Sequence, residues 1–172
     1  EGAALRRRRA DIQLIFQDPY GSLDPRQTVE RIVGEPLVIH AIGDRSERKR
    51  RVLGLIERVG LGAEHLDRHP HEFSGGQRQR IGIARALALK PDVLVADEPV
   101  SALDVSVQAQ VLKLLADLRQ RLGLSIVFIT HDLRVAAQIC DLVAVMKDGK
   151  VVEHGLAGEV FGNPQHLYAG AA

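Results

Sequence analysis

The alternation of apolar runs with helical patterns is the feature that most limits how this chain can fold. Apolar runs at residues 12–16, 93–96 and 124–130 predict short buried strands, and helical spacing over residues 105–121 joins the last two. Strands without polar alternation are typical of parallel sheets, whose strands are linked by helices. We therefore predict an α/β fold in which helices cover both faces of a mostly parallel sheet.

The end of the chain is predicted to form a helix and a hairpin. A helix is expected over residues 133–139, and strands over residues 142–146 and 151–153. Asp148 and Gly149 stand between these strands, and this pair favours a tight hairpin turn.

A predominantly helical segment is predicted over residues 28–90. Thr28 can cap a helix that Pro36 should limit in length, and apolar residues at helical period predict a longer helix over residues 44–60. We expect one domain over residues 1–172 with this helical subdomain inserted into it.

Composition excludes several classes of protein. Lys and Arg number 23 and Asp and Glu number 22, so the net charge of +1 provides no global attraction to nucleic acid or anionic lipid. The single cysteine, Cys140, cannot form a disulfide within the chain. No apolar run approaches the roughly 18 residues that a membrane-spanning helix needs.

Two adjacent carboxylates follow the central apolar run. Asp97 and Glu98 stand at the carboxyl end of a predicted strand, where ligands of open α/β sheets bind. Asp97 can hold Mg²⁺ through its hydration shell, and Glu98 can polarise a water for attack on phosphorus. Apolar strands that end in acidic residues are common, so the pair alone leaves a structural role equally open.

A serine and two glycines open a predicted helix. Ser74, Gly75, Gly76 and Gln77 would expose backbone N–H groups and the positive end of the helix dipole, and the glycines let a phosphate approach closely. The alternative is an ordinary serine N-cap.

Three further polar residues fall near predicted strand ends. Gln17 follows the first strand, and its amide could ligate Mg²⁺ or position a water. His131 follows residues 124–130 and could contact a γ-phosphate, although a helix-capping role is the alternative. Asp104 ends a loop directly after the acidic pair and is also expected to cap the next helix.

Taken in order, these motifs resemble the ATP-binding subunits of ABC transporters. Gln17 matches the Q-loop, residues 74–77 the signature motif, residues 93–98 the Walker B strand, residues 101–104 the D-loop and His131 the H-loop.

The wording of the motifs is similar to the oligopeptide and dipeptide permease branch. The strings IFQDP at residues 15–19, FSGGQRQR at residues 73–80 and DEPVSALDVSVQAQ at residues 97–110 carry this similarity, as does NPQH at residues 163–166.

The resemblance implies an ABC-type P-loop NTPase core that binds and hydrolyses ATP with Mg²⁺ and powers import of peptides or similar small solutes. Glu98, His131 and Gln17 would be catalytic, and Asp97 and Gln17 would contact Mg²⁺. The nucleotide would contact Ser74, Gly75, Gly76, Gln77 and Asp104.

The same resemblance implies the partners of the chain. These are a second ABC ATPase subunit, identical or different, the transmembrane permease subunits and, indirectly, an extracytoplasmic solute-binding protein; nucleic acid is not expected. The chain would lie at the cytoplasmic face of the inner membrane as a peripheral protein, with Tyr20 near the permease docking surface. Peptides, nickel and glutathione remain open as cargo.

A Walker A loop, G-x-x-x-x-G-K-[ST], is missing from these 172 residues. The pair Gly149 and Lys150 lies in the predicted hairpin and cannot serve as one. In the family this loop precedes the Q-loop, so we expect a chain truncated at its N-terminus that has negligible ATP binding and hydrolysis alone. A naturally degenerate subunit that supplies only the signature half-site is the alternative.

Two other functions compete with this interpretation. DNA-repair ABC ATPases insert a coiled coil or zinc module between Q-loop and signature motif, whereas residues 18–73 here are compact and helical; a non-catalytic interaction module is the other. His65, His69 and His71 could suggest a metal site, but Pro70 interrupts the helix that would align them, which favours a structural role.

Overall fold

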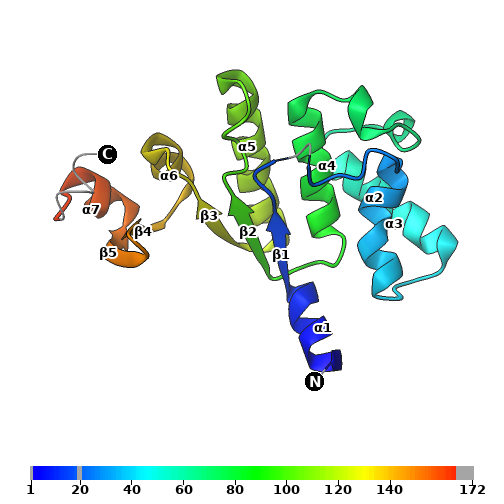
Figure 1. Ribbon diagram of the computed structural model, residues 1–172, viewed down its shortest axis with the longest axis horizontal. Coiled ribbons are helices and arrows are strands. Elements are labelled where there is room, and N and C mark those ends of the chain that lie inside the picture. The colour runs from blue at the N-terminus through cyan, green and yellow to red at the C-terminus, as the bar shows by residue number, and fades with distance from the viewer. Residues whose placement is uncertain (1, 19–20, 166–172) are drawn as a thin grey trace. The chain divides into compact units, whose positions relative to one another are not determined.

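The computed structural model of the chain describes residues 2–18 and 21–165. The chain divides into two compact units, Glu1–Ile129 and Thr130–Ala172. Within the described residues, the first unit holds a three-stranded sheet with its helices, and the second a two-stranded hairpin (Figure 1).

The sheet of the first unit is parallel and has the order β1-β2-β3. Its strands are β1 (Ile12–Ile15), β2 (Val93–Asp97) and β3 (Ser125–Ile129). The long connections between these strands contain helices, as parallel pairing requires. The predicted parallel α/β sheet is therefore confirmed.

The two faces of this sheet are buried to different extents. On one face, Ile15 pairs in register with Ala96, and both are buried, as is Leu94. On the other face, Leu14 is 40% exposed and Val127 is 51% exposed. The prediction that helices cover both faces is thus wrong for the described part of the chain, because β1 and β3 present apolar side chains to solvent.

Strand β1 shows this difference most clearly. The strand expected over residues 12–16 forms, but only Ile15 is buried, whereas Ile12 is 53% exposed and Phe16 is 47% exposed. In the described sheet β1 is an edge strand with β2 on one side. Its apolar composition therefore does not indicate burial on both faces here.

The helices of the first unit begin and end at recognisable signals. They are α1 (Gly2–Asp11), α2 (Val29–Ile39), α3 (Arg45–Arg58), α4 (Gly75–Leu87) and α5 (Val105–Leu122), with short 3₁₀ turns η1 (Ala63–His65) and η2 (Pro70–Glu72). Asp44 caps α3 by accepting from the N–H of Glu47 at 2.8 Å. Gly123 follows α5 with a positive φ of 67°, the usual conformation of a helix-ending glycine.

Pro36 lies inside α2 instead of limiting it. The helix continues to Ile39, and its residues Val33 and Leu37 are fully buried. A proline in a helix loses one backbone hydrogen bond, so burial of the apolar face outweighs this loss. The expectation that Pro36 would limit the helix is therefore wrong.

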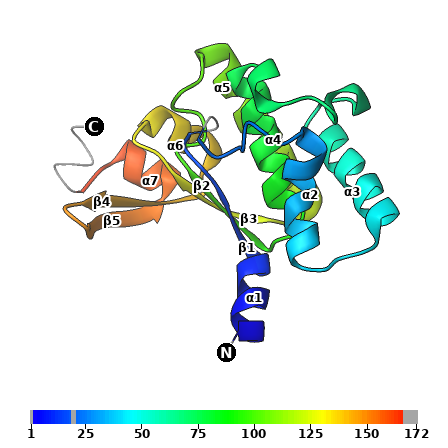
Figure 2. The ribbon, with the colours of Figure 1, turned by 45° about the vertical axis from the view of Figure 1, so that its right-hand side comes forward.

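Helices α2, α3 and α4 pack against one another beside the sheet, as Figure 2 shows. Val52 and Ile56 on α3 and Ile81 on α4 are buried, and the helix predicted over residues 44–60 from its apolar spacing forms as α3. Helix α4 also packs on β1, so the signature motif and the strand ends belong to one packed unit.

The second unit contains α6 (Leu133–Ile139), β4 (Leu142–Lys147), β5 (Lys150–Leu156) and α7 (Ala157–Gly162). The strands are antiparallel, and the turn residues Asp148 and Gly149 have φ values of 49° and 74°. This confirms the predicted hairpin. The subdomain over residues 28–90 stays a prediction, and Tyr20 and His166 lie outside the described residues.

Candidate nucleotide site

The acidic pair at the end of β2 stands in a tight turn. Asp97 is the last residue of β2 and is half-buried, and Glu98 follows with a φ of 42°. This left-handed backbone costs about 1–3 kcal/mol for a residue other than glycine. The N–H of Glu98 donates to the carbonyl of Ile129 at 2.9 Å, and its carbonyl accepts from the N–H of Ser101 at 3.2 Å. Hydrogen bonds to β3 and to the next loop thus hold Glu98 in place.

Gln17 and Glu98, which are far apart in the sequence, meet directly. The amide Nε2 of Gln17 donates to Oε2 of Glu98 at 2.8 Å. Parallel pairing of β1 with β2 explains this contact, because it places the ends of both strands at the same edge of the sheet. The structure therefore brings together two of the residues that the sequence predicted for the site.

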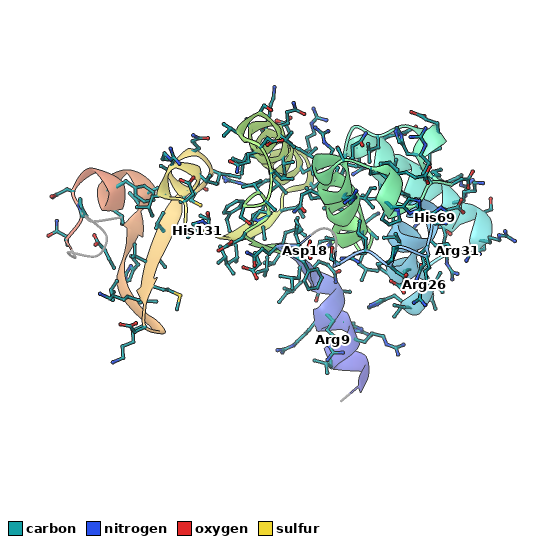
Figure 3. All side chains as sticks on the ribbon, turned by 45° about the horizontal axis from the view of Figure 1, so that its top comes forward. Arg9, Asp18, Arg26, Arg31, His69 and His131 are labelled. Carbon is teal, nitrogen blue, oxygen red and sulfur yellow. The ribbon has the colours of Figure 1, made fainter. Side chains whose placement is uncertain are left out.

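A cleft of about 1090 Å³ lies beside β1. Asp97 and Gln17 line it at the carboxyl ends of the strands, and Ile12, Leu14 and Phe16 contribute apolar walls. Leu14 pairs with Val95, and Asp97 lies two residues further along β2, so these side chains share the more exposed face of the sheet. The cleft therefore lies along this face. Figure 3 labels Asp18, another lining residue, where the chain leaves β1.

Arg85 from α4 closes one side of this cleft. Its Nη1 donates to the carbonyl of Ser22 at 2.6 Å, and its guanidinium lies 5.8 Å from the centre of the Phe16 ring. Burial lowers the pKa of Arg85, and the Glu35 carboxylate opposes this change. Arg85 thus anchors the loop that follows Gln17 to the helical part of the unit.

The first turn of α4 satisfies its polar groups through a capping box. Ser74 Oγ accepts from the N–H of Gln77 at 3.3 Å, and Gln77 Oε1 accepts from the N–H of Ser74 at 3.0 Å. Among the described residues, the N–H groups of Gly75 and Gly76 have no hydrogen-bond partner. The helix start is therefore a serine cap that still leaves two donors for an anion.

The loop after the acidic pair is held by α5. Gln108 Nε2 donates to the carbonyls of Val100 and Leu103, both at 3.0 Å. Asp104 occupies the N-cap position but its side chain makes no cap hydrogen bond. The expectation that Asp104 caps α5 is thus wrong for its carboxylate, which is exposed.

His131 belongs to the second unit, where it precedes α6 (Figure 3). Asp132 caps this helix by accepting from the N–H of Arg134 at 2.9 Å, so capping is not the task of His131. The hydrogen bond from the Arg134 side chain holds the pKa of Asp132 below its ordinary value. The catalytic role of His131 stays a prediction.

Two residues that shape the site were missed by the sequence analysis, Gln108 and Arg85. Arg85 follows Ile81 by one helical turn, so a cation in line with a buried residue could have indicated a partner on another element. Gln108 stands four residues after Asp104 in the first turn of α5, where an amide can reach back to the preceding loop. Within the described part of the chain, no cluster of three or more His, Cys, Asp or Glu side chains is arranged to hold a metal ion.

The strand ends, the signature-like helix start and the parallel sheet agree with a known class of protein. The family model described as ABC transporter matches residues 2–101. The chain belongs to this family.

The similarity extends to curated relatives in the predicted branch. The chain is 57% identical over 164 residues to the dipeptide transport ATP-binding protein DppF of Escherichia coli (strain K12), a match that covers 95% of this chain and 49% of that protein. It is 56% identical to the glutathione import ATP-binding protein GsiA of Pectobacterium atrosepticum, with 98% and 27% covered. The chain thus spans about half or less of the length of these relatives.

Solved structures confirm the fold. The dimeric ATP-binding cassette MJ0796, in a post-hydrolysis state bound to ADP and Pi, matches with a TM-score of 0.77 and 32% identity over 91% of this chain and 67% of that one. The structure of cbiO1 from Clostridium perfringens, part of the ABC transporter complex cbiONQ, matches with a TM-score of 0.80 and 33% identity, covering 90% and 60%. None of the described helices has the length and hydropathy of a membrane span.

Proposed function

We propose that these residues are part of an ATPase that powers import of peptides or similar small solutes. Glu98 acts as the general base toward the attacking water, while Gln17 and His131 position that water and the γ-phosphate. Asp97 and the amide oxygen of Gln17 are oxygen donors of the kind that Mg²⁺ prefers, and both residues line the cleft. Bound there, Mg²⁺ would neutralise phosphate charge.

The contact between Gln17 and Glu98 is the observation that carries this proposal. A general base must present one oxygen to the water, and the 2.8 Å hydrogen bond from Gln17 restrains the carboxylate from the side of β1. Because Gln17 also begins the loop held by Arg85, a movement of that loop would move the catalytic carboxylate. This link provides a physical route from the surface of the protein to the reaction.

The first turn of α4 with its cap, residues 74–77, is called the signature turn here. It completes the site of a second subunit. The N–H groups of Gly75 and Gly76 are directed from a helix N-terminus, which favours the charge of a γ-phosphate. Asp104 and residues 74–77 thus contact nucleotide held mainly by the neighbouring chain. The dimeric state of the related cassette MJ0796 supports this arrangement.

ATP hydrolysis requires a Walker A loop in addition to the 172 residues. Gly149 lies in the hairpin turn, Lys150 begins β5 and Val151 follows it, so this pair cannot cradle phosphate. We propose that these residues on their own neither bind ATP tightly nor hydrolyse it, since the main contacts to the β- and γ-phosphates are missing.

The relatives support the transport role and its cargo class. Their names refer to dipeptide transport and glutathione import, and we extend this to the present chain as import of small peptides. The protein would act at the cytoplasmic face of the membrane with permease subunits and a solute-binding protein.

Two assays test the proposed function. Purified full-length gene product should hydrolyse ATP in the presence of Mg²⁺, and deletion of the gene should abolish uptake of labelled dipeptide but not of an unrelated labelled sugar. Absence of ATP hydrolysis would overturn the enzymatic role, and unchanged uptake of both dipeptide and glutathione would overturn the assigned cargo.

A further inference from the structure

The first turn of α4 lies against the first turn of α5, and Gly76 is the point of closest approach. Gly76 is buried, and a Cβ atom built on it would lie 2.4 Å from Cγ1 of Val107. A Cβ atom cannot approach another carbon so closely without displacing it. Valine in a helix strongly prefers one rotamer, so its methyl group cannot rotate away at low cost. Val107 therefore requires a residue without a side chain at position 76.

Neighbouring contacts extend this interface between the first turns of α4 and α5, which we call the seam. A Cβ atom on Gly75 would lie 3.2 Å from Cδ2 of Leu103, which belongs to the loop after the acidic pair. One turn along α4, Nη2 of Arg80 donates to Oε1 of Gln110 on α5 at 3.2 Å. The start of α4 thus contacts both the loop at residues 101–104 and the helix that follows it.

The seam continues into the loop through α5. Gln108, the residue after Val107, donates to the carbonyl of Leu103 in this loop and to that of Val100 directly before it. The same short segment therefore packs on the signature turn and fixes the backbone of residues 101–104.

We propose that Val107 is a positioning residue that locks the signature turn to the D-loop, so that both approach a neighbouring subunit's nucleotide as one body. This inference rests on the proposed ATPase function and adds to it. Val107 acts through Gly76 and not on the nucleotide. The seam converts two separate motifs into one rigid surface.

A compensating pair of substitutions tests the proposal in the full-length gene product. Gly76→Ala introduces the clash, and Val107→Ala in the same protein removes Cγ1 and leaves the Val107 Cβ position 3.8 Å from the new methyl, an ordinary contact. Gly82→Ala is the matched control, because it lies on the same helix and its added Cβ would meet nothing within 4 Å.

Steady-state ATPase kinetics give the main readout. Gly76→Ala should lower kcat about 10- to 100-fold, as expected for a displaced site, while KM for ATP changes by less than about twofold. The double variant should regain about half of the wild-type kcat or more, and Gly82→Ala should behave as wild type.

The outcomes separate the inference from the function on which it rests. If the wild type hydrolyses ATP but the double variant stays as impaired as Gly76→Ala, or Gly76→Ala is unimpaired, the positioning role is overturned alone. If Gly76→Ala does not fold, recovery of folding and activity in the double variant supports the role, and failure of both overturns it. A wild type without ATPase activity overturns the proposed function and the positioning role with it; a melting temperature lowered by Gly76→Ala and restored in the double variant would then show a packing contact only.

Discussion

At the start of α4 the chain satisfies most of its own polar groups, whereas at the end of β2 it leaves a carboxylate beside a cleft. Ser74 and Gln77 cap each other, and Gly76 is packed against Val107. Asp97, in contrast, lines the cleft on the open face of the sheet. The first region is capped and closely packed, whereas the second leaves a polar side chain accessible, as the proposed binding and catalytic roles require. Substitutions in the two regions should therefore separate into losses of stability and losses of turnover.

The largest effect is expected at the end of β2. Glu98→Gln keeps the shape of the side chain but removes the proposed general base, so ATP hydrolysis by the full-length gene product should fall about 10²- to 10⁴-fold. ATP affinity and melting temperature should stay close to wild type. Retained turnover would assign the base to another residue, and a large loss of stability would break the contrast between the two regions.

A smaller loss of turnover is expected at Gln17. Gln17→Leu removes the hydrogen bond to Glu98, and a hydrogen bond to a charged group is worth about 1.5–3 kcal/mol, which corresponds to about 10- to 100-fold in rate. Single-turnover hydrolysis measures this effect. Gln13→Leu on the same strand is the control, because Gln13 hydrogen bonds to the backbone of Arg9; an equal loss in both variants would mean that disturbance of β1, and not the contact with Glu98, is responsible.

Substitution in the capping box of α4 should lower stability, in contrast to the losses of turnover expected at Glu98 and Gln17. Ser74→Ala removes the acceptor for the N–H of Gln77 and should lower the free energy of unfolding by about 1 kcal/mol. Ser74→Asn, which can still cap the helix, should cost less. Urea denaturation of the full-length gene product measures both, and equal midpoints for wild type and Ser74→Ala would show that the cap contributes nothing.

The smallest effect concerns the approach to the signature turn. The backbone N–H of His69 donates to Glu72 at 2.6 Å and, with the charges of His71 and Arg68, keeps the pKa of Glu72 below its ordinary value. Because the folded pKa is lower than the unfolded one, this contact stabilises the fold above the unfolded pKa, and its contribution is lost as pH falls through the folded pKa. Glu72→Gln should therefore show a weaker drop in melting temperature than wild type below about pH 4.5. Parallel acid profiles would contradict this contribution.

The sequence predicted elements better than it predicted their surroundings. The apolar run at residues 12–16 predicted a strand, and β1 forms over Ile12–Ile15, but composition does not reveal which neighbours cover a strand, and Leu14 is exposed. Pro36 was expected to limit a helix because local propensity was weighed without tertiary packing, which buries the adjacent Leu37. Local signals therefore locate elements, while burial depends on segments distant in the chain.

The site shows the same limit. The family resemblance assigned both Gln17 and Glu98 to the catalytic site, and the structure places them in direct contact, while their roles stay a prediction. The sequence explained the glycine at position 76 only by the close approach of a phosphate. The need to avoid Val107 was not predicted, because it arises from a helix packing that no local pattern encodes. Residue types that chemistry requires can be read from the sequence, whereas those required by close packing need the structure.

A mixing experiment tests most directly whether the two regions belong to sites shared between subunits. The full-length gene product with Glu98→Gln and the same protein with Gly76→Asp should each be inactive, whereas an equimolar mixture should regain up to about a quarter of wild-type ATPase activity. Random pairing makes about half of the dimers mixed, and each mixed dimer then has one site with both defects and one with neither. A mixture as inactive as its two components would contradict the account, because it would place the end of β2 and the start of α4 of one chain in the same site.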